Sequence, residues 1–168
     1  MNKYQHLIDH YAKLAEIGHE GQFRSDGKKY FTHAEAVANL VQRNQEVIDY
    51  VNQFNITGDI QAGIIILAYF HDLFEEVPDY FRLIVTPDMQ AKMQENPDNY
   101  FLNTVYSGVK AISKMEKGKE DYTDYLFRVK NHEWARMVKI ADLTHNMSDL
   151  KPGNLRDKYS ISKYFLEH

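Results

Sequence analysis

The sequence predicts an all-α protein, a bundle of about seven or eight helices in one domain. Apolar residues recur at spacings of three and four along most of the chain, which is the period of an amphipathic helix. No second segment shows the alternation of apolar and polar residues that marks a half-buried strand, and no internal repeat or linker divides the chain. A chain of 168 residues with 43% hydrophobic residues can bury one core, so residues 1–168 are expected to form one domain.

The first part of the chain contains two amphipathic segments separated by a polar loop. Residues 2–18 place their apolar side chains on one helical face, and residues 18–29 contain three glycines, which indicates a loop. Thr32 is expected to cap the next helix because its hydroxyl can accept from a first-turn amide, and Glu35 lies at the capping-box position. That helix is expected to continue to about Phe54.

The next predicted helix, from Ile60 to about Glu76, contains the most apolar stretch. A turn over residues 55–59 precedes this helix, and Pro78 follows it. The run from Ile64 to Leu67 is also compatible with a buried strand on periodicity alone. Helix is favoured because no other segment has the strand pattern with which such a run would pair.

The second half of the chain is expected to be helical as well. Pro87 and Pro97 indicate short helices around irregular connections in residues 79–98. A helix over residues 99–115 follows, with Gly118 marking its end. The remaining predicted helices cover residues 122–129, residues 133–149 and a terminal segment from about Leu155.

Composition and charge exclude several classes of protein. The net charge of −4 gives no general electrostatic case for binding nucleic acid or an anionic membrane. The absence of cysteine excludes disulfides and thiolate metal sites. The N-terminus lacks the apolar stretch of a signal peptide, and the longest apolar run, residues 62–70, is too short to span a bilayer. We expect a cytoplasmic protein without nucleic-acid or membrane partners, of open oligomeric state.

Four titratable side chains follow the most apolar segment directly: His71, Asp72, Glu75 and Glu76. In a helix Asp72 and Glu76 would share one face, as would His71 and Glu75. Burying charge without a partner is costly, whereas imidazole and carboxylate are good ligands for a divalent cation. A metal ion would therefore compensate this cluster. The alternative is a helix end whose polar side chains reach solvent.

Two more polar clusters contain candidate ligands. His33 lies at the start of a helix, after a loop with three basic residues that include Arg24. Asp142 lies in a helical segment, three residues after Lys139 and four before Asn146. Alone, His33 is also compatible with a surface or capped histidine. Asp142 is likewise compatible with a buried aspartate satisfied by Lys139 or Asn146.

A third cluster, residues 114–125, combines lysines with Tyr122 and Tyr125. Taken alone it is a solvated face, unless other residues place a phosphate beside it. Tyr122 and Tyr125 can edge such a pocket or pack in the core.

His33, the pair His71-Asp72 and Asp142 reproduce the H…HD…D order of HD-domain metal-dependent phosphohydrolases. The chain resembles most closely the hydrolase domains of Rel/SpoT-type alarmone enzymes, and its residues 120–125 resemble small stand-alone HD proteins. The matching blocks are Gln22-x-Arg24-x-x-Gly27-x-x-Tyr30-x-x-His33, Phe70-His71-Asp72-x-x-Glu75-Glu76 and Lys139-x-Ala141-Asp142-x-x-His145-Asn146. The resemblance spans about residues 18–150 and implies the HD-domain helical bundle.

Four positions depart from the pattern of that family. Alarmone hydrolases usually have Glu-Asp after the HD pair, where this chain has Glu75-Glu76. They usually have a basic residue after the loop arginine, where this chain has Ser25. Their last block usually reads Ala-Asp-Arg-Leu-His-Asn, and Leu143 and Thr144 replace its Arg and Leu here. The metal ligands are unaffected, so the departures concern nucleotide specificity.

The resemblance implies roles for the polar residues. One divalent metal ion would be held by His33, His71, Asp72 and Asp142. Mn²⁺ is the usual metal of the family, and such nitrogen and oxygen ligands would also accept Fe, Co, Ni, Zn or Mg. Glu75 and Glu76 would orient or deprotonate the attacking water. The implied substrate-binding residues are Arg24, Lys139, Asn146, Tyr122 and Tyr125, with Arg24 as a bidentate phosphate clamp.

The predicted reaction is metal-dependent hydrolysis of a phosphoester on a nucleotide, most specifically removal of the 3′-pyrophosphate of (p)ppGpp or a related alarmone. One alternative is an HD phosphohydrolase that acts on another nucleotide or nucleoside phosphate. A second alternative is a metal- or nucleotide-binding module without turnover. Glu75 and Glu76 argue against the module, because binding alone has no evident need for them.

Overall fold

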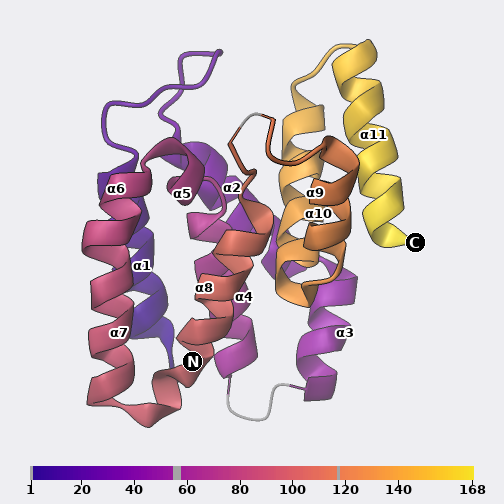
Figure 1. Cartoon of the computed structure of the whole chain (residues 1–168). Coiled ribbons are helices and arrows are strands. Elements are labelled where there is room, and N and C mark those ends of the chain that lie inside the picture. The colour runs from indigo at the N-terminus through magenta and orange to yellow at the C-terminus, as the bar shows by residue number, and fades with distance from the viewer. Residues whose placement is uncertain (1, 55–57, 117) are drawn as a thin grey trace.

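The computed structural model describes residues 2–54, 58–116 and 118–168, which are all-α (Figure 1). The only β-type pairing among these residues is an isolated bridge between Phe23 and Lys29. The helices of nine or more residues are α1 (Gln5–Gly18), α2 (Phe31–Arg43), α3 (Gln45–Phe54), α4 (Asp59–Phe70), α7 (Thr86–Glu95), α8 (Phe101–Ile112), α9 (Tyr122–Lys130), α10 (Glu133–Ser148) and α11 (Asn154–Glu167). The shorter helical segments are α5 (Leu73–Glu76), α6 (Pro78–Tyr80), the π-helical turn η1 (Phe81–Val85) and the 3₁₀ turn η2 (Pro97–Tyr100). The all-α prediction is confirmed, but these described residues form more helices than the seven or eight predicted.

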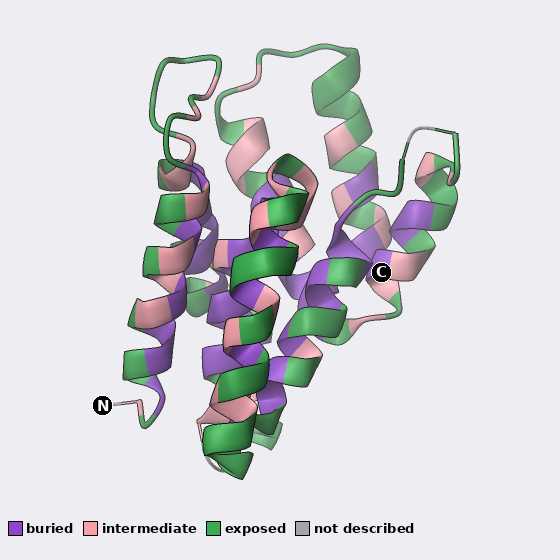
Figure 2. Ribbon diagram, turned by 60° about the vertical axis from the view of Figure 1, so that its left-hand side comes forward, coloured by how far each residue is buried: buried purple, intermediate pink, exposed green. Residues whose placement is uncertain are grey.

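Helix α4 is the central element of the bundle and contacts α1, α2, α8 and α10. All its residues from Ala62 to Ala68 are buried, so the run from Ile64 to Leu67 is helical and not a strand. The outer helices turn buried residues inward and exposed residues toward solvent (Figure 2). Burying one large aliphatic side chain contributes about 1.5–3 kcal/mol. Helix α4 is therefore a rigid support for the residues that follow it.

Gly63 allows α10 to approach α4 closely. A Cβ atom at Gly63 would lie 2.3 Å from Cζ3 of Trp134, a separation that no real contact shows. Eight residues separate Gly63 from His71, and eight separate Trp134 from Asp142. Gly63 contacts Trp134, and His71 lies close to Asp142. Helices α4 and α10 therefore run side by side in the same direction and bring His71 and Asp142 together at one end of the bundle.

The helix predicted over residues 32–54 is two helices, α2 and α3. Asn44 between them has an extended backbone, and its Oδ1 accepts from the backbone N–H groups of Glu46 (2.9 Å) and Val47 (3.3 Å). Asn44 is therefore the cap of α3, and asparagine is among the residues that cap helices best.

The prediction that Thr32 caps α2 is wrong. Helix α2 begins at Phe31, and the Thr32 hydroxyl donates to the carbonyl of Lys29 instead of accepting from a first-turn amide. No side-chain hydrogen bond caps α2, so the capping box with Glu35 does not form.

Other predicted boundaries differ from the structure by different amounts. The helix predicted over residues 60–76 ends at Phe70, and the one over residues 99–115 ends at Ile112. Residues 79–98 are more regular than predicted: the chain is helical without interruption from Pro78 to Glu95. Helices α9, α10 and α11 lie within one residue of their predicted bounds. Most of the predicted turn at residues 55–59 lies outside the described residues.

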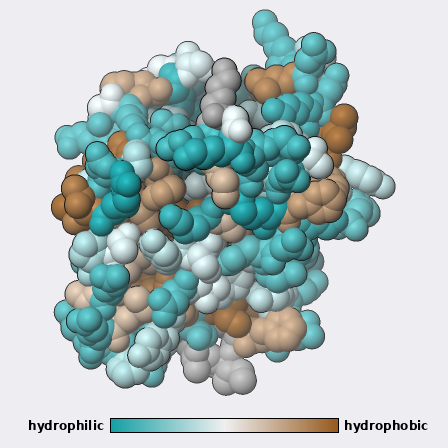
Figure 3. Space-filling model, in the orientation of Figure 1, coloured by the Kyte–Doolittle hydropathy of each residue, from teal (hydrophilic) through white to brown (hydrophobic). Residues whose placement is uncertain are grey.

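Segments that contain polar motifs gather at one end of the bundle: residues 19–30, α5 and residues 113–116 after α8 (Figure 1). The face shown in Figure 3 is mainly hydrophilic, with scattered apolar side chains. Among the described residues, no helix has the length and apolar character needed to cross a membrane.

Candidate metal centre

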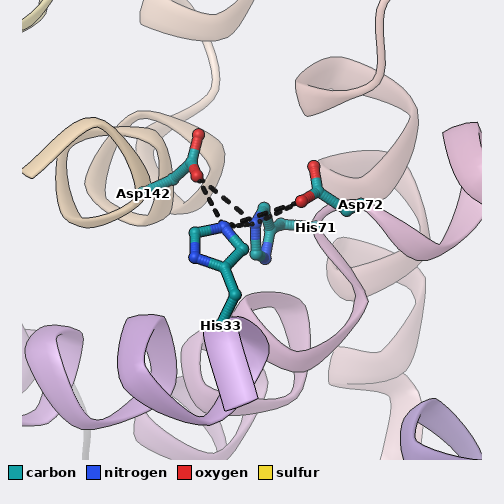
Figure 4. A group of neighbouring side chains, drawn as sticks. All are labelled: His33, His71, Asp72 and Asp142. Atoms are coloured by element: carbon teal, nitrogen blue, oxygen red, sulfur yellow. Dashed lines mark hydrogen bonds and ion pairs between the residues drawn. The ribbon is translucent and has the colours of Figure 1, made fainter. Parts of the chain in front are cut away.

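Four buried or half-buried side chains from three segments converge at this end of the bundle (Figure 4). His33 extends from the first turn of α2, His71 and Asp72 from the junction of α4 and α5, and Asp142 from α10. One ligand atom from each lies within 4.8 Å of the other three. The residues predicted as metal ligands are thus brought together.

The spacing of these atoms suits a single divalent ion. Nε2 of His33 lies 3.2 Å from Nε2 of His71 and 2.9 Å from Oδ1 of Asp142. Oδ2 of Asp72 lies 3.1 Å from Nε2 of His71 and 3.6 Å from Nε2 of His33. Around an octahedral ion with bonds of about 2.1 Å, neighbouring ligand atoms lie about 3 Å apart. The cluster has the size of such a shell.

An interruption of the helix lets two adjacent residues reach the same point. On a continuous helix, consecutive side chains point about 100° apart. Helix α4 ends at Phe70, and α5 begins at Leu73, so His71 and Asp72 lie in a turn between them. This turn brings Nε2 of His71 to 3.1 Å from Oδ2 of Asp72. The predicted single helix over residues 60–76, with its shared faces, is therefore corrected.

The tautomer of His71 also suits a metal ligand. Its Nδ1 lies 2.7 Å from the carbonyl oxygen of Ala68, which can only accept, so Nδ1 carries the proton. Nε2, the nitrogen that remains for a metal, then points into the cluster, toward another imidazole nitrogen and two carboxylates. Four electron-rich groups in contact require a positive charge among them, and this donor set fits a divalent cation.

The pKa shifts of His71 and Asp142 also indicate that the cluster favours positive charge. Burial alone would lower the pKa of His71, but the carboxylates of Asp72 and Asp142 outweigh it and raise that pKa to about 10. Burial alone would raise the pKa of Asp142, but Lys139 and then the two histidines hold it well below its usual range. Without an ion, the cluster therefore retains protons that a metal would have to displace.

A chain of hydrogen bonds also orients Asp142. Nζ of Lys139 donates to its Oδ2 over 2.7 Å, and Nδ2 of Asn146 donates to its Oδ1 over 2.7 Å. Nη2 of Arg24 in turn donates to Oδ1 of Asn146 over 3.1 Å. Three residues predicted to bind substrate are thus joined to the metal cluster.

A polar cavity of about 370 Å³ opens beside the cluster. Arg24, Lys114 and Lys139 bring three positive charges to it, and Glu75 and Glu76 bring two carboxylates. Burial raises the pKa of both glutamates. The full lining is Phe23, Arg24, Ser25, Tyr30, His33, Asp72, Glu75, Glu76, Lys114, Lys139, Asp142, Asn146 and Tyr159.

Tyr122 and Tyr125 are not among the described residues that line this cavity. Tyr125 is buried, and its hydroxyl donates to the carbonyl of Ile112 over 2.8 Å. The hydroxyl of Tyr122 lies 3.1 Å from Oγ of Ser162 in α11. Both contacts are those of packing between helices, the alternative that the sequence left open for these two residues.

The structure adds four residues to which the sequence assigned no role. Tyr30 donates to Oδ2 of Asp72 over 2.8 Å, and His145 lies against His33. Both belong to the motif blocks, so their presence there was an available signal. Lys114 and Tyr159 line the cavity from segments outside these blocks. Lys114 begins the lysine-rich cluster of residues 114–125, which was an available signal, whereas nothing in the sequence near Tyr159 indicates its position.

Comparison with known proteins shows sequence similarity to two larger bacterial proteins. The chain is 29% identical over 156 residues to the guanosine-3′,5′-bis(diphosphate) 3′-pyrophosphohydrolase of Haemophilus influenzae, covering 92% of this chain and 20% of that protein. It is 28% identical over 152 residues to the bifunctional (p)ppGpp synthase/hydrolase SpoT of Escherichia coli K12, covering 85% of this chain and 18% of that protein.

The chain therefore spans about a fifth of the length of these relatives. No family model matches it. The sequence similarity and the His/Asp cluster nevertheless both indicate a relationship to hydrolases of this type. This chain is a distant homologue of SpoT-type (p)ppGpp hydrolases and contains an HD-like cluster of two histidines and two aspartates.

Proposed function

We propose that the chain is an HD-type, metal-dependent phosphohydrolase that removes the 3′-pyrophosphate of (p)ppGpp or a related alarmone. The observation that carries this proposal is a buried His₂Asp₂ cluster open to a cavity with three cationic side chains. Such a cavity suits a substrate with several phosphates. The distant relatives whose names include this reaction support the choice of substrate.

The proposed metal ligands are His33, His71, Asp72 and Asp142, and Mn²⁺ is the proposed ion. A divalent ion held there supplies Lewis acidity: it lowers the pKa of a coordinated water toward about 7 and polarises a phosphoryl oxygen. Three of the proposed ligands, His33, Asp72 and Asp142, line the cavity themselves. A phosphate and a water would therefore approach from the cavity.

Glu75 and Glu76 are the proposed residues that handle the water. Both line the cavity one turn beyond Asp72, and Glu75 is the more deeply buried. Burial raises the pKa of Glu75, which improves a carboxylate as a proton acceptor near neutral pH. In the proposed reaction the water oxygen bonds to phosphorus, the P–O bond to the 3′ oxygen breaks, and that oxygen takes up a proton.

Arg24 and Lys114 are the proposed phosphate contacts. The guanidinium of Arg24 can hold two phosphate oxygens while its Nη2 remains near Asn146. Lys114, which lines the same cavity, adds a further positive charge. Nζ of Lys139 already donates a hydrogen bond to Asp142, so the proposed role of Lys139 is to orient that ligand and to neutralise its charge.

A second candidate is hydrolysis of another nucleotide or nucleoside phosphate. Two of the four departures from the alarmone pattern, Ser25 and Glu76, line the cavity directly. Leu143 is buried, and Thr144 lies outside that lining. The differences that can touch a substrate are therefore concentrated in the pocket, which favours a changed substrate over a lost site.

One panel experiment tests these candidates. Purified protein with Mn²⁺ is incubated with ppGpp, pppGpp, NADPH, GTP, dNTPs and nucleoside monophosphates, and released phosphate and pyrophosphate are measured. Pyrophosphate release from ppGpp, abolished in Asp72→Ala and Glu75→Gln, is the expected result. Turnover of another member favours the second candidate. Full metal binding without any turnover would overturn both and indicate a binding module.

A further inference from the structure

His145 faces the metal cluster from behind His33. Its Nδ1 lies 2.7 Å from Nδ1 of His33, and the two rings are tilted by 40° with centroids 4.8 Å apart. His145 is on α10, three residues after Asp142, so the helix that supplies one ligand also supports another. This is the only hydrogen bond recorded for the His145 ring within the described part of the chain.

The direction of this hydrogen bond follows from what His33 must do. Nε2 of His33 faces Asp142 at 2.9 Å and His71 at 3.2 Å, so this is the nitrogen available to a metal. A nitrogen that binds a cation cannot hold a proton, so Nδ1 of His33 carries the proton. Nδ1 of His145 is then the acceptor, and the proton of a neutral His145 lies on Nε2.

The two histidine ligands are therefore held by different kinds of acceptor. His71 donates its Nδ1 proton to the backbone carbonyl of Ala68, an acceptor that no substitution removes. His33 donates to a side chain. Partners of this kind fix the tautomer and the ring orientation of a metal ligand, and their loss typically costs about 10- to 100-fold in metal affinity.

We infer that His145 is a positioning residue that holds His33 in the tautomer and orientation required for metal binding. This inference rests on the proposed metal site and is independent of the identity of the substrate. His145 lines a separate cavity of about 360 Å³ with Ala36, Leu40 and Arg43, on the side away from the cluster. An altered side chain at this position therefore has space without displacing α2.

Two variants separate the acceptor from the bulk of the side chain. In His145→Asn, Oδ1 takes the position of Nδ1 and can accept the same proton. In His145→Leu the volume remains similar and no acceptor is present. We expect His145→Leu to bind Mn²⁺ about 10- to 100-fold more weakly and His145→Asn to stay within a few-fold of wild type, by calorimetric titration. Thr144→Val on the same helix is the matched control, with unchanged affinity.

A spectroscopic measurement locates the proton directly. In ¹⁵N-histidine-labelled protein loaded with diamagnetic Zn²⁺, a scalar coupling across the hydrogen bond is expected between Nδ1 of His33 and Nδ1 of His145. The proton signal should correlate with the ring of His33. A proton on Nδ1 of His145 would overturn the inference, because the bond would then run the other way.

The outcomes distinguish a failure of the positioning role of His145 from a failure of the proposed function. Equal Mn²⁺ affinity in wild type and His145→Leu, or an equal loss in both variants at this position, overturns the positioning role. Normal Mn²⁺ binding by wild type without turnover of any nucleotide overturns the proposed function and leaves His145 in its role. A wild-type protein that binds no divalent ion overturns both.

Discussion

The hydroxyl of Tyr30 donates to Oδ2 of Asp72 over 2.8 Å, and this oxygen is the one that faces both histidines of the cluster. The other side of the Tyr30 ring stacks on the buried His19, with centroids 4.9 Å apart. The loop before α2 thus supplies a rigid donor that orients a carboxylate from the junction of α4 and α5. Tyr30 connects two motif blocks that lie far apart in the sequence.

Replacing Tyr30 by phenylalanine tests this connection. The ring and its stacking on His19 remain, and only the hydrogen bond to Asp72 is lost. A hydrogen bond to a charged group contributes about 1.5–3 kcal/mol, so Mn²⁺ affinity is expected to fall about 10- to 100-fold. Calorimetric titration measures this change. Unaltered affinity in Tyr30→Phe would mean that Asp72 is oriented without this hydroxyl.

Metal binding is expected to stabilise the fold, because three separate segments supply the ligands only when folded. Mn²⁺ at 100 times its dissociation constant should add about 2.7 kcal/mol to the free energy of unfolding. For a domain of this size, that corresponds to a rise in Tm of about 5–10 °C. Differential scanning fluorimetry with EDTA and with Mn²⁺ measures it. His71→Ala should show no rise, and an equal rise in that variant would contradict the site.

The four proposed metal ligands can be singled out from the sequence because their chemistry is visible in residue type, and the structure brings these four side chains together. A histidine-aspartate pair after a buried helix needs a partner charge whatever its exact geometry. The interruption between α4 and α5 was not predicted, because the apolar pattern continues through Phe74 and contains no glycine or proline at the turn.

The cavity wall is less predictable than the ligands. Lys114 and Tyr159 reach it because α8 and α11 pack against α10, and such packing is a property of the whole fold. Tyr125 shows the reverse case: a polar motif in the sequence suggested a pocket residue, whereas its hydroxyl satisfies the end of α8. The cap at Asn44 was predictable, since asparagine is a favoured helix cap and Glu46 places an acidic residue in the first turn of α3.

Lys114 offers a test of the cavity as the substrate site. It makes no contact with the metal ligands in the proposed arrangement, so Lys114→Gln should leave Mn²⁺ affinity unchanged. A phosphate contact present in both ground and transition states changes KM more than kcat. We expect KM to rise about 10-fold, from the loss of a charge-assisted contact of about 1.4 kcal/mol. Lys119→Gln, at an exposed ion pair with Glu116, is the control. Equal KM values in both variants would exclude Lys114 from binding.

Arg128 anchors the connection that contains Lys114. Its guanidinium donates to both carboxylate oxygens of Glu120 and to the carbonyls of Lys110, Ala111 and Ser113 at the end of α8. Arg128→Ala removes all five hydrogen bonds and leaves Glu120 without its partner. The expected loss is about 3 kcal/mol of unfolding free energy, measured by urea denaturation.

The exposed pair of Arg82 and Asp79 provides the comparison for that loss. Arg82→Ala should cost less than about 1 kcal/mol, as exposed ion pairs typically do. Similar losses in the two arginine variants would show that the anchor at Arg128 is no stronger than a surface contact.

His132 should make the stability of the fold depend on pH. Its Nδ1 accepts from the backbone N–H of Ala135 and caps α10, while its Nε2 lies 2.9 Å from Oγ of Ser107, whose own proton goes to Thr104. The Nε2–H group of His132 therefore donates to Ser107, and the contact with Ala135 requires an unprotonated Nδ1 and so a neutral ring. Burial lowers the pKa of His132 below its ordinary value of 6.5, so the unfolded chain takes up this proton at a higher pH than the folded chain does.

The direction of the effect follows from that difference. Above the unfolded pKa the ring is neutral in both states and the contribution of His132 is fully present. As the pH falls from about 7, protonation favours the unfolded chain, until the folded pKa is passed and the loss is complete. In His132→Asn the amide oxygen still caps α10 but does not titrate. Urea denaturation at pH 7.5 and 5.5 should therefore show a smaller loss of stability in the variant than in wild type.

His132→Ala separates capping from titration. It should be less stable than His132→Asn by about 1 kcal/mol at both pH values, because the cap is lost. Its dependence on pH should match that of His132→Asn, because neither side chain titrates. If wild type and both variants lost the same stability between pH 7.5 and 5.5, the acid sensitivity of the fold would have to come from other groups, and the half-buried His132 would be excluded as its source.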